Sequence, residues 1–458
     1  MIDDFEVYAS DENGNVEIRK VKDIDEFFKN EYVNFASYDN VRKIASYIDG
    51  LKNSSRKVIH TILDKNIVNE YKIQRMTSLV AEYTEFIHGE NNLEGVICNL
   101  AQNFTCSNNI NLLYPEGNFG TRFAPTPSAA RYIYSHKEKV IDYIFRKEDS
   151  PILIQQMFEG NKIEPKFFVP IIPMLLVNGA NGVSLGFAQK ILPRNPKELI
   201  KHIETFLKNG KLPKEILPHF NGFKGVVRKT EPLKYDICGT FERKGRGTIV
   251  ITELPNNYNQ KSYKKVLKTL MEKKIIKRFR DLSEDDNFLF EVSVSLDFMK
   301  KTDESILSTL KLVNKFTENL TTLDEDLKIR VFKDEVEILE AYIQKRLEYH
   351  TKRKNYRIEE LSRLLEELED RKLFVSSVVS SKLKIFKRNK EDIVDDCKKL
   401  GIKNYDMHLR LGIFSLTEEK IQELKNQIDF TNKELEYIKS TSEKDIWLKE
   451  LQELKKII

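Results

Sequence analysis

The chain has 458 residues, and its 76 basic residues exceed its 71 acidic residues by 5, so its net charge is +5. At roughly 100–200 residues per domain, this length predicts two to four domains, while so small a surplus of charge is weak support for a polyanionic partner. The acidic N-terminus lacks the apolar core of a secretory signal, and the most apolar run, residues 167–177, is too short and too rich in proline to span a bilayer.

Residues 1–35 are acidic and polar, and we expect them to form an N-terminal arm. From about residue 41 to residue 102, apolar residues recur at helical spacing in short segments separated by DGLKNSS and HGENN, which predicts a compact helical module. Residues 103–130 are rich in Asn, Gly, Pro and Thr and are expected to form a loop. Four scattered cysteines without a CxxC pair indicate free thiols in a reducing cytoplasm.

The region that follows, about residues 150–330, mixes strand and helix patterns. Apolar alternation with glycine turns predicts strands within residues 223–255, and NFLFEVSVSL returns to a strand pattern. Residues 260–280 between them are predicted to be a helix rich in lysine. Such a run is most often a solvated helix face. If instead its interleaved apolar residues dock the helix, the lysines would face one way and track nucleic-acid phosphates. Those apolar residues are Tyr263, Leu267, Leu270 and Ile276.

The C-terminal region has a different pattern. Residues 333–372 contain no Gly or Pro and carry an apolar stripe, which predicts one helix of about 40 residues and roughly 60 Å. A second stripe, residues 421–438, steps by three and four with one gap at Thr431. Two long helices flanking a smaller unit are typical of an antiparallel hairpin with a knob at its tip, and periodicity alone is equally compatible with a helical dimer or spacer.

No nucleotide-binding motif is evident, because neither GxxxxGK[ST] nor GxGxxG occurs in the chain. If the protein depends on ATP, we therefore expect another chain to bind the nucleotide.

Three segments carry a family resemblance. IDGLKNSSRKVIHTI (residues 48–62) resembles the DGLKPVxRR element of type IIA DNA topoisomerases. EGNFGTRFAPTPSAARYIYS (residues 116–135) resembles their GNFG loop and the helix with the Arg–Tyr nucleophile pair, and residues 170–196 resemble their LVNG segment. The order and spacing match from about residue 35 onward. The chain is most similar to the medium subunits of T-even-type phage topoisomerases and resembles the N-terminal region of gyrase A.

The resemblance implies an α+β multidomain fold and a homodimer that closes through a C-terminal gate. The implied parts are, in chain order, an N-terminal arm (1–35), a winged-helix DNA-cleavage domain (36–145), a mixed α/β tower domain (146–330), and a long antiparallel coiled coil with the helical C-gate (331–458).

The same resemblance covers only the breakage–reunion half of the enzyme, since the family's ATPase and acidic Toprim motifs are absent from the sequence. It implies an obligate partner chain that binds ATP and holds Mg²⁺, with no metal site in this chain. Double-stranded DNA would be the substrate, in the nucleoid or the cytoplasm of a host. The glycine-rich box of gyrase is missing, which favours relaxation over supercoiling.

By resemblance, Tyr132 attacks a phosphodiester and becomes joined to the 5′ end of the broken strand. A free phenol has a pKa of about 10, so less than about 1% is ionised at neutral pH, and neighbouring groups must accept the proton or stabilise the charge. The motif implies that Arg131 holds the scissile phosphate. Arg56, in SSRKV, matches the second family arginine, whose charge would stabilise the crowded phosphorane.

Four further residues are implied by the motifs. His88, in HGE, is expected near the scissile phosphate, and a structural role is an equally weighted alternative because a lone His is more often structural. Phe86 stands where the family often has an additional His. Val183 matches an intercalating isoleucine and would act as a wedge that bends DNA, with core packing as the alternative. Lys52 and Lys57 are predicted to contact the DNA backbone.

Two other functions remain compatible with these patterns. One is a non-catalytic winged-helix and coiled-coil scaffold that binds DNA, and the other is a gyrase-like enzyme whose wrapping domain lies elsewhere. The intact set of Arg56, Arg131 and Tyr132 favours an enzyme over a scaffold.

Overall fold

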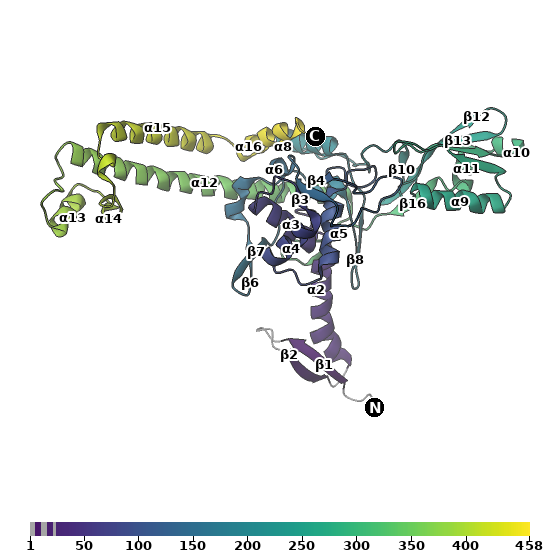
Figure 1. Cartoon of the computed structure of the whole chain (residues 1–458), viewed down its shortest axis with the longest axis horizontal. Coiled ribbons are helices and arrows are strands. Elements are labelled where there is room, and N and C mark those ends of the chain that lie inside the picture. The colour runs from purple at the N-terminus through teal and green to yellow at the C-terminus, as the bar shows by residue number, and fades with distance from the viewer. Residues whose placement is uncertain (1–4, 11–15, 22–23) are drawn as a thin grey trace. The chain divides into compact units, whose positions relative to one another are not determined.

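The computed structural model in Figure 1 describes residues 5–10, 16–21 and 24–458. The predicted arm, residues 1–35, lies only partly within these ranges. Among the helices described, none combines the length and the apolarity that a membrane span requires.

The chain divides into two compact units. The first comprises residues 1–346 together with 450–458, and the second comprises residues 347–449. The division into four parts drawn from the sequence is finer than this, and its boundaries stay a prediction.

The N-terminal part of the first unit is a hairpin followed by a helical segment. β1 (Phe5–Ser10) pairs antiparallel with β2 (Val16–Val21). α1 (Ile24–Phe27), a π-helical turn (Phe28–Tyr32) and α2 (Val33–Lys43) then follow without interruption. The domain boundary predicted at residue 36 therefore falls inside α2.

A helical module comes next, as the apolar spacing predicts, and a small antiparallel sheet, which the spacing did not predict, packs with it. Val58, Ile62 and Leu93 are buried in its core together with Ile133 from the sheet. The helices are α3 (Asn53–Asp64), α4 (Ile73–Tyr83) and α5 (Glu90–Ala101), and the strands, in spatial order, are β3 (Tyr71–Lys72), β5 (Tyr134–Lys137) and β4 (Leu113–Glu116).

Short elements and two hairpins connect this module to α8. Helix α8 begins at an Asn195 cap, whose side chain accepts hydrogen bonds from the next turn, and ends at Gly210 in the left-handed region. The elements are α6 (Ile141–Ile144), a 3-10 turn (Lys147–Ile152), β6 (Gln155–Phe158), β7 (Asn161–Pro165), α7 (Met174–Asn178), β8 (Ala180–Val183), β9 (Ala188–Ile191) and α8 (Pro196–Asn209).

The predicted mixed region contains two antiparallel sheets, in spatial order β10-β11-β16 and β12-β13-β15-β14, and a two-stranded pair, β17 and β18. The strands are β10 (Val226–Glu231), β11 (Lys234–Cys238), β12 (Thr240–Lys244), β13 (Thr248–Glu253), β14 (Arg278–Asp281), β15 (Phe290–Ser293), β16 (Val313–Thr317), β17 (Thr321–Leu323) and β18 (Ile329–Val331). The helices are α9 (Gln260–Glu272), α10 (Leu296–Met299) and α11 (Asp303–Thr309).

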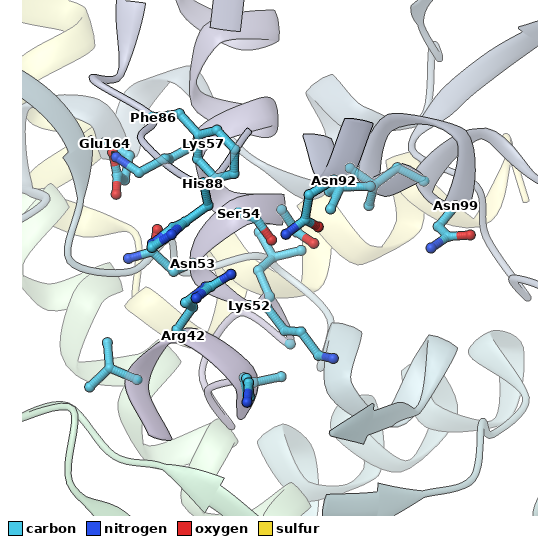
Figure 2. Close-up of a pocket in the computed structure, with 18 of the residues that line it drawn as sticks. Arg42, Lys52, Asn53, Ser54, Lys57, Phe86, His88, Asn92, Asn99 and Glu164 are labelled. Atoms are coloured by element: carbon cyan, nitrogen blue, oxygen red, sulfur yellow. The ribbon is translucent and has the colours of Figure 1, made fainter. Parts of the chain in front are cut away.

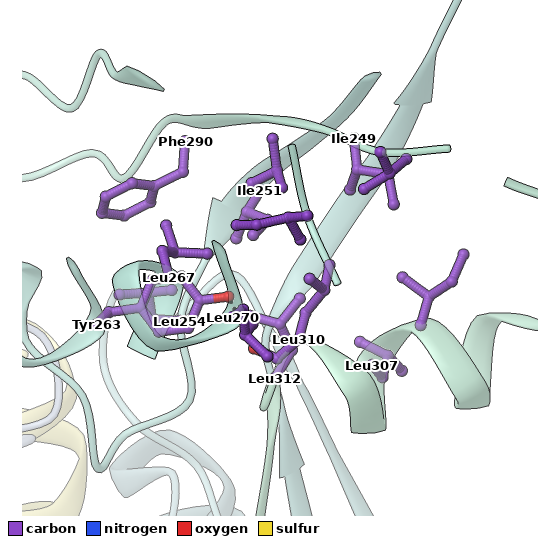
Figure 3. Packing of buried hydrophobic residues seen from close by; sticks show 14 of the residues in the cluster. Ile249, Ile251, Leu254, Tyr263, Leu267, Leu270, Phe290, Leu307, Leu310 and Leu312 are labelled. Atoms are coloured by element: carbon purple, nitrogen blue, oxygen red, sulfur yellow. Dashed lines mark hydrogen bonds between the residues drawn. The ribbon is translucent and has the colours of Figure 1, made fainter. Parts of the chain in front are cut away.

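Helix α9 packs on the four-stranded sheet through Tyr263, Leu267 and Leu270, which meet Ile251 and Phe290 in one apolar cluster (Figure 3). The docking of this lysine-rich helix is thus confirmed. Its predicted length is wrong, because the helix ends at Glu272 rather than at residue 280. The last residues of the predicted helix join the sheet as part of strand β14 instead.

The second unit is an antiparallel helical hairpin, as the two apolar stripes predict. α12 (Glu335–Val379) and α15 (Glu418–Ser440) run side by side (Figure 1), and Arg357 donates to Glu434 across them at 2.6 Å. A knob of α13 (Lys390–Lys399), α14 (Tyr405–His408) and a 3-10 turn (Ile413–Ser415) joins the two, and α16 (Glu443–Lys455) follows α15.

The gap in the second stripe also has a physical explanation. Thr431 is buried, and its hydroxyl donates to the Gln427 carbonyl at 2.8 Å. A polar side chain is tolerated at this position because its own helix satisfies it.

Candidate active site

Tyr132 lies in a turn between the glycine-containing loop and β5. Its neighbours Ala130 and Ile133 are buried in the core of the helical module, whereas 67% of the Tyr132 surface is exposed. The Tyr132 N–H donates to the Ala129 carbonyl at 2.9 Å, which closes the turn. The tyrosine is therefore presented to solvent on a buried frame and does not fill the core.

Arg131 accompanies Tyr132 on this turn. Its guanidinium lies 4.9 Å from the centroid of the Tyr132 ring, within the range of a cation–π contact. The expectation that the pair lies on a helix is wrong, because the residues form a turn that leads directly into β5. A turn lets two consecutive side chains face solvent while the residues on either side are buried.

The preceding loop is tied down tightly. The Gln102 side chain donates to the Phe119 carbonyl at 2.9 Å and to the Pro125 carbonyl at 3.0 Å, which joins the two halves of the loop. Gly120 has φ +93°, and a Cβ there would lie 2.6 Å from the Pro125 oxygen, so only glycine fits. These contacts fix the backbone that leads into the turn that carries Tyr132.

A cavity of about 650 Å³ lies where the end of α2, the start of α3, the loop after α4 and the β6–β7 hairpin converge. Arg42, Lys52 and His88 line it and surround the same opening (Figure 2). The structure thus places Lys52 and His88 in the lining of one cavity. Arg131 and Tyr132 do not line this cavity.

Arg42 is a residue of this cavity that the motifs did not indicate. It is half-buried at the C-terminal end of α2, and its side chain forms no hydrogen bond or ion pair with another residue of the described ranges. Its guanidinium is therefore available to an anion. In the sequence its only signal is a basic pair at a helix end, which is common among 76 basic residues.

His88 lies at the edge of the cavity, and its Nε2 is 2.6 Å from the hydroxyl of Tyr38 on α2. Burial lowers the pKa of His88 below its ordinary value, and the positive charges of Arg42 and Lys57 lower it further. The imidazole is therefore neutral near pH 7. The ring of Phe86 packs edge-on at 5.7 Å, so this position contributes an aromatic wall.

The Lys52 side chain lines the cavity next to the β8–β9 hairpin. Its ammonium donates to the Asn181 carbonyl at 2.7 Å, and burial lowers the pKa of Lys52. The hydrogen bond joins the start of α3 to the strand that carries Val183.

Val183 ends β8 and is 68% exposed, which excludes core packing. The hairpin that carries it is fixed from behind, because the Leu185 N–H donates to the Asp39 carboxylate at 3.1 Å. Gly182 is needed there, since a Cβ would lie 2.3 Å from the Lys43 carbonyl oxygen. An apolar side chain is thus held at the tip of a braced hairpin.

Arg56 has a different environment from the one predicted. It is only 2% exposed, its Nε lies 2.7 Å from the fully buried Asp49 carboxylate, and its Nη2 donates to the Leu51 carbonyl. Asp49 also accepts the Phe168 N–H at 3.1 Å. This ion pair holds the loop before α3, and its burial argues against the predicted contact between Arg56 and a phosphate.

Lys57 is likewise turned inward. It is 9% exposed, and its ammonium donates to the Thr84 carbonyl at 2.6 Å and to the Glu164 carboxylate at 2.8 Å. The direct contact with the DNA backbone predicted for Lys57 does not match this position.

The residues described, 5–10, 16–21 and 24–458, contain no group of three or more His, Cys, Asp or Glu side chains arranged to hold a metal ion. The polar groups of the cavity are mainly cationic or amide donors, which suit anions rather than cations.

Comparison with known proteins decides the family. A sequence model that describes the A-subunit of DNA gyrase/topoisomerase IV matches residues 42–452. The chain belongs to this family. The type IIA resemblance seen in the motifs is therefore confirmed, whereas the specific likeness to phage proteins stays a prediction.

Relatives of the family extend well beyond this chain. The mitochondrial DNA topoisomerase 2 of Dictyostelium discoideum is 32% identical over 450 residues, which cover 94% of this chain and 35% of that protein. DNA topoisomerase 2 of Saccharomyces cerevisiae is 30% identical over 490 residues, covering 94% and 34%. The chain thus spans about a third of the length of these relatives.

The solved structures include a close match in fold. The crystal structure of the DNA-binding, cleavage and re-ligation domain of Plasmodium falciparum topoisomerase II superposes with a TM-score of 0.84 at 30% identity. The match covers 94% of this chain and 64% of that chain. This member of the gyrase/topoisomerase IV family therefore shares its mixed α/β fold with that domain.

Proposed function

We propose that this chain is the breakage–reunion subunit of a type II DNA topoisomerase, which cuts both strands of one duplex, lets a second duplex pass and reseals the break. The observation that carries the proposal is the solvent-exposed Tyr132 beside Arg131 on a turn whose flanking residues are buried. Membership of the gyrase/topoisomerase IV A-subunit family supports it.

In the proposed reaction the phenolic oxygen of Tyr132 attacks a DNA phosphorus. A phosphotyrosyl bond to the 5′ end forms as the bond to the 3′ oxygen breaks, and the phenolic proton is lost while the 3′ oxygen gains one. Arg131, whose guanidinium lies over the ring, holds the phosphate and stabilises the charge that develops on it. Because the ester replaces an ester, the 3′ hydroxyl can attack it and restore the strand.

The cavity holds phosphates of the cleaved strand. Arg42 supplies the charge that the sequence assigned to Arg56, since Arg42 lines the opening and Arg56 is buried. In the tautomer of the neutral His88 whose Nε2 accepts from the Tyr38 hydroxyl, Nδ1–H is left as a donor to phosphate. Lys52 adds a charge-assisted contact at the opposite side.

Val183 acts as the wedge that bends the bound duplex. An exposed apolar side chain on a braced hairpin suits insertion between base pairs. Bending costs on the order of 1–6 kcal/mol, and wider contact with the backbone offsets it. The exposed lysines of α9, among them Lys265 and Lys268, provide a surface for such contact.

The remaining parts of the fold take the roles that the motifs imply. We assign a winged-helix domain, a tower domain and a coiled coil with a C-gate to the predicted ranges. A homodimer closing at the knob is supported by exposed apolar side chains there: Phe414 is 97% exposed, Phe386 70% and Met407 54%.

A partner chain completes the enzyme. Type II topoisomerases use Mg²⁺ and ATP, and bound Mg²⁺ supplies a charge that stabilises the attacked phosphate. The cationic lining of the cavity does not fit that ion, so we assign Mg²⁺ and ATP to the partner and derive no step through them in this chain.

The test is reconstitution with a candidate ATPase and Toprim chain on supercoiled circles. The proposal predicts ATP-dependent relaxation and, after rapid denaturation, DNA covalently linked to this chain. A scaffold would bind DNA without linkage, which would refute the proposal. Incubation with relaxed circles separates the gyrase-like alternative, which alone would introduce supercoils.

A further inference from the structure

Lys57 occupies a position that its predicted role does not explain. It lies in the second turn of α3, and its side chain extends toward Glu164 in the wall of the cavity (Figure 2). Glu164, on β7, is 1% exposed and lies 2.8 Å from the ammonium. A buried ammonium is retained where its partners satisfy it, and Glu164 is one of these partners.

The second partner of Lys57 is the loop that carries His88. The ammonium donates to the Thr84 carbonyl at 2.6 Å, at the point where this loop leaves α4. Glu85 then adopts a left-handed backbone with φ +51°, which a non-glycine residue keeps only when its surroundings enforce it. Lys57 is one of those surroundings.

Lys57 therefore joins three elements around one cavity. Helix α3, the loop with His88 and the β6–β7 hairpin all meet at its ammonium. Lys52, the N-cap of α3, and Phe158 and Ile163 of the hairpin contribute to the same lining. Loss of the ammonium would remove the hydrogen bond that joins the loop with His88 to α3 and, through Lys57, to the hairpin.

We propose that Lys57, paired with Glu164, is a positioning residue that holds the His88 loop at the phosphate-binding cavity and does not itself contact DNA. This rests on the proposed function, because its readout is DNA cleavage. Glu164 takes part in the same positioning interaction. A role in DNA contact would not predict an acidic residue at this place.

The experiment uses the reconstituted holoenzyme with its partner chain, after the wild type has been shown to cleave. Lys57→Met and Glu164→Gln are each expected to slow single-turnover cleavage at saturating DNA by roughly 10- to 100-fold. The DNA dissociation constant and its salt dependence should stay unchanged. A phosphate contact by Lys57 would instead lower the salt slope by about 0.9 for Lys57→Met alone, and that result would overturn the proposal.

A double-mutant cycle that combines Lys57→Met with His88→Gln distinguishes a positioning role of Lys57 from a general loosening of the fold. If Lys57 acts through His88, Lys57→Met added to His88→Gln should cause little further loss of cleavage. A full additional loss would contradict the proposal. Lys57→Arg, which keeps the charge and the donors, should restore part of the rate.

Folding is controlled separately. The double variant Lys57→Met with Glu164→Leu removes both charges and is expected to melt near the wild-type temperature, yet to cleave slowly because the Thr84 carbonyl still lacks its donor. Wild-type cleavage by this double variant would refute the proposal. Absence of cleavage in the wild-type holoenzyme would refute the proposed function instead.

Discussion

Two pairs of residues with similar sequence signatures behave in opposite ways in this protein. Arg131 and Tyr132 lie in a turn and face solvent, whereas Arg56 and Lys57 lie in α3 and face buried carboxylates. Both pairs belong to segments that resemble functional motifs. The difference shows that a motif identifies a neighbourhood, and the local backbone decides which side chains can reach a ligand.

The cause is the packing on either side of each pair. In the turn, Ala130 and Ile133 enter the core and leave the two residues between them outside. In α3, four consecutive positions from Arg56 to Ile59 are all buried, because the helix is covered on several sides. We therefore propose that Arg42, from another helix, supplies the cationic contact with DNA.

The largest expected effect is at the exposed pair, Arg131 and Tyr132, where the comparison can be tested most severely. Tyr132→Phe keeps the ring and removes the nucleophile, so cleavage by the holoenzyme should fall by roughly 10⁴-fold or more. The amount of protein-linked DNA that is trapped by denaturation measures this cleavage. The matched control is Tyr134→Phe, two residues on in β5 and only half-exposed, which should cleave normally. Comparable losses in both variants would contradict the assignment.

The two arginines assigned opposite roles provide the next test. Arg56→Met leaves the buried Asp49 carboxylate without its charged partner, which should cost about 3–5 kcal/mol of unfolding free energy. Arg42→Met should change stability by less than about 0.5 kcal/mol but lower the salt slope of DNA binding by about 0.9. Chemical unfolding and salt titrations measure the two. The reverse pattern would restore Arg56 as the phosphate contact.

A pH profile examines His88. Burial lowers its pKa below the ordinary 6.5, so the folded imidazole stays neutral to lower pH than in the unfolded chain. Cleavage should be constant above the ordinary pKa and decline in acid, because protonation of His88 disfavours the folded state that positions it. His88→Gln should cleave roughly 10- to 100-fold more slowly at neutral pH and lose this acidic decline. If His88→Gln keeps the decline of cleavage in acid, that decline arises from another titrating group.

The smallest expected effect concerns the wedge. Val183→Ala keeps the hairpin, which Asp39 and Gly182 brace, but shortens the exposed side chain. DNA bending, measured by energy transfer between labelled duplex ends, should decrease, and affinity should fall only several-fold because part of the bending cost of about 1–6 kcal/mol also disappears. Wild-type bending in this variant would remove Val183 from the DNA interface.

Much of the fold could be predicted because its signals are local. The apolar stripes gave both long helices of the second unit, and the spacing of Tyr263 and Leu267 gave the docked face of α9. The end of α9 was missed because strand β14 is set by pairing with β15, a contact that the local sequence does not reveal.

The site was predictable only as far as the motifs reached. They pointed to Tyr132, which the structure exposes in a turn, and to His88, which lines the cavity, and composition predicted a loop before Tyr132. They gave no sign of Arg42, which the fold brings to the cavity from a separate helix. The motifs also did not reveal that Arg56 pairs with a buried carboxylate. The loop between Asp49 and Arg56 brings the two side chains together, and the motif residues alone do not show its path.

The most direct test of the central claim is to locate the covalent bond between protein and DNA. Trapped complexes from the reconstituted holoenzyme can be digested with protease and nuclease, and the modified peptide sequenced by mass spectrometry. The account predicts a single nucleotide adduct, joined through a 5′ phosphate to the oxygen of Tyr132. An adduct on any other side chain, or a bond to a 3′ phosphate, would contradict it.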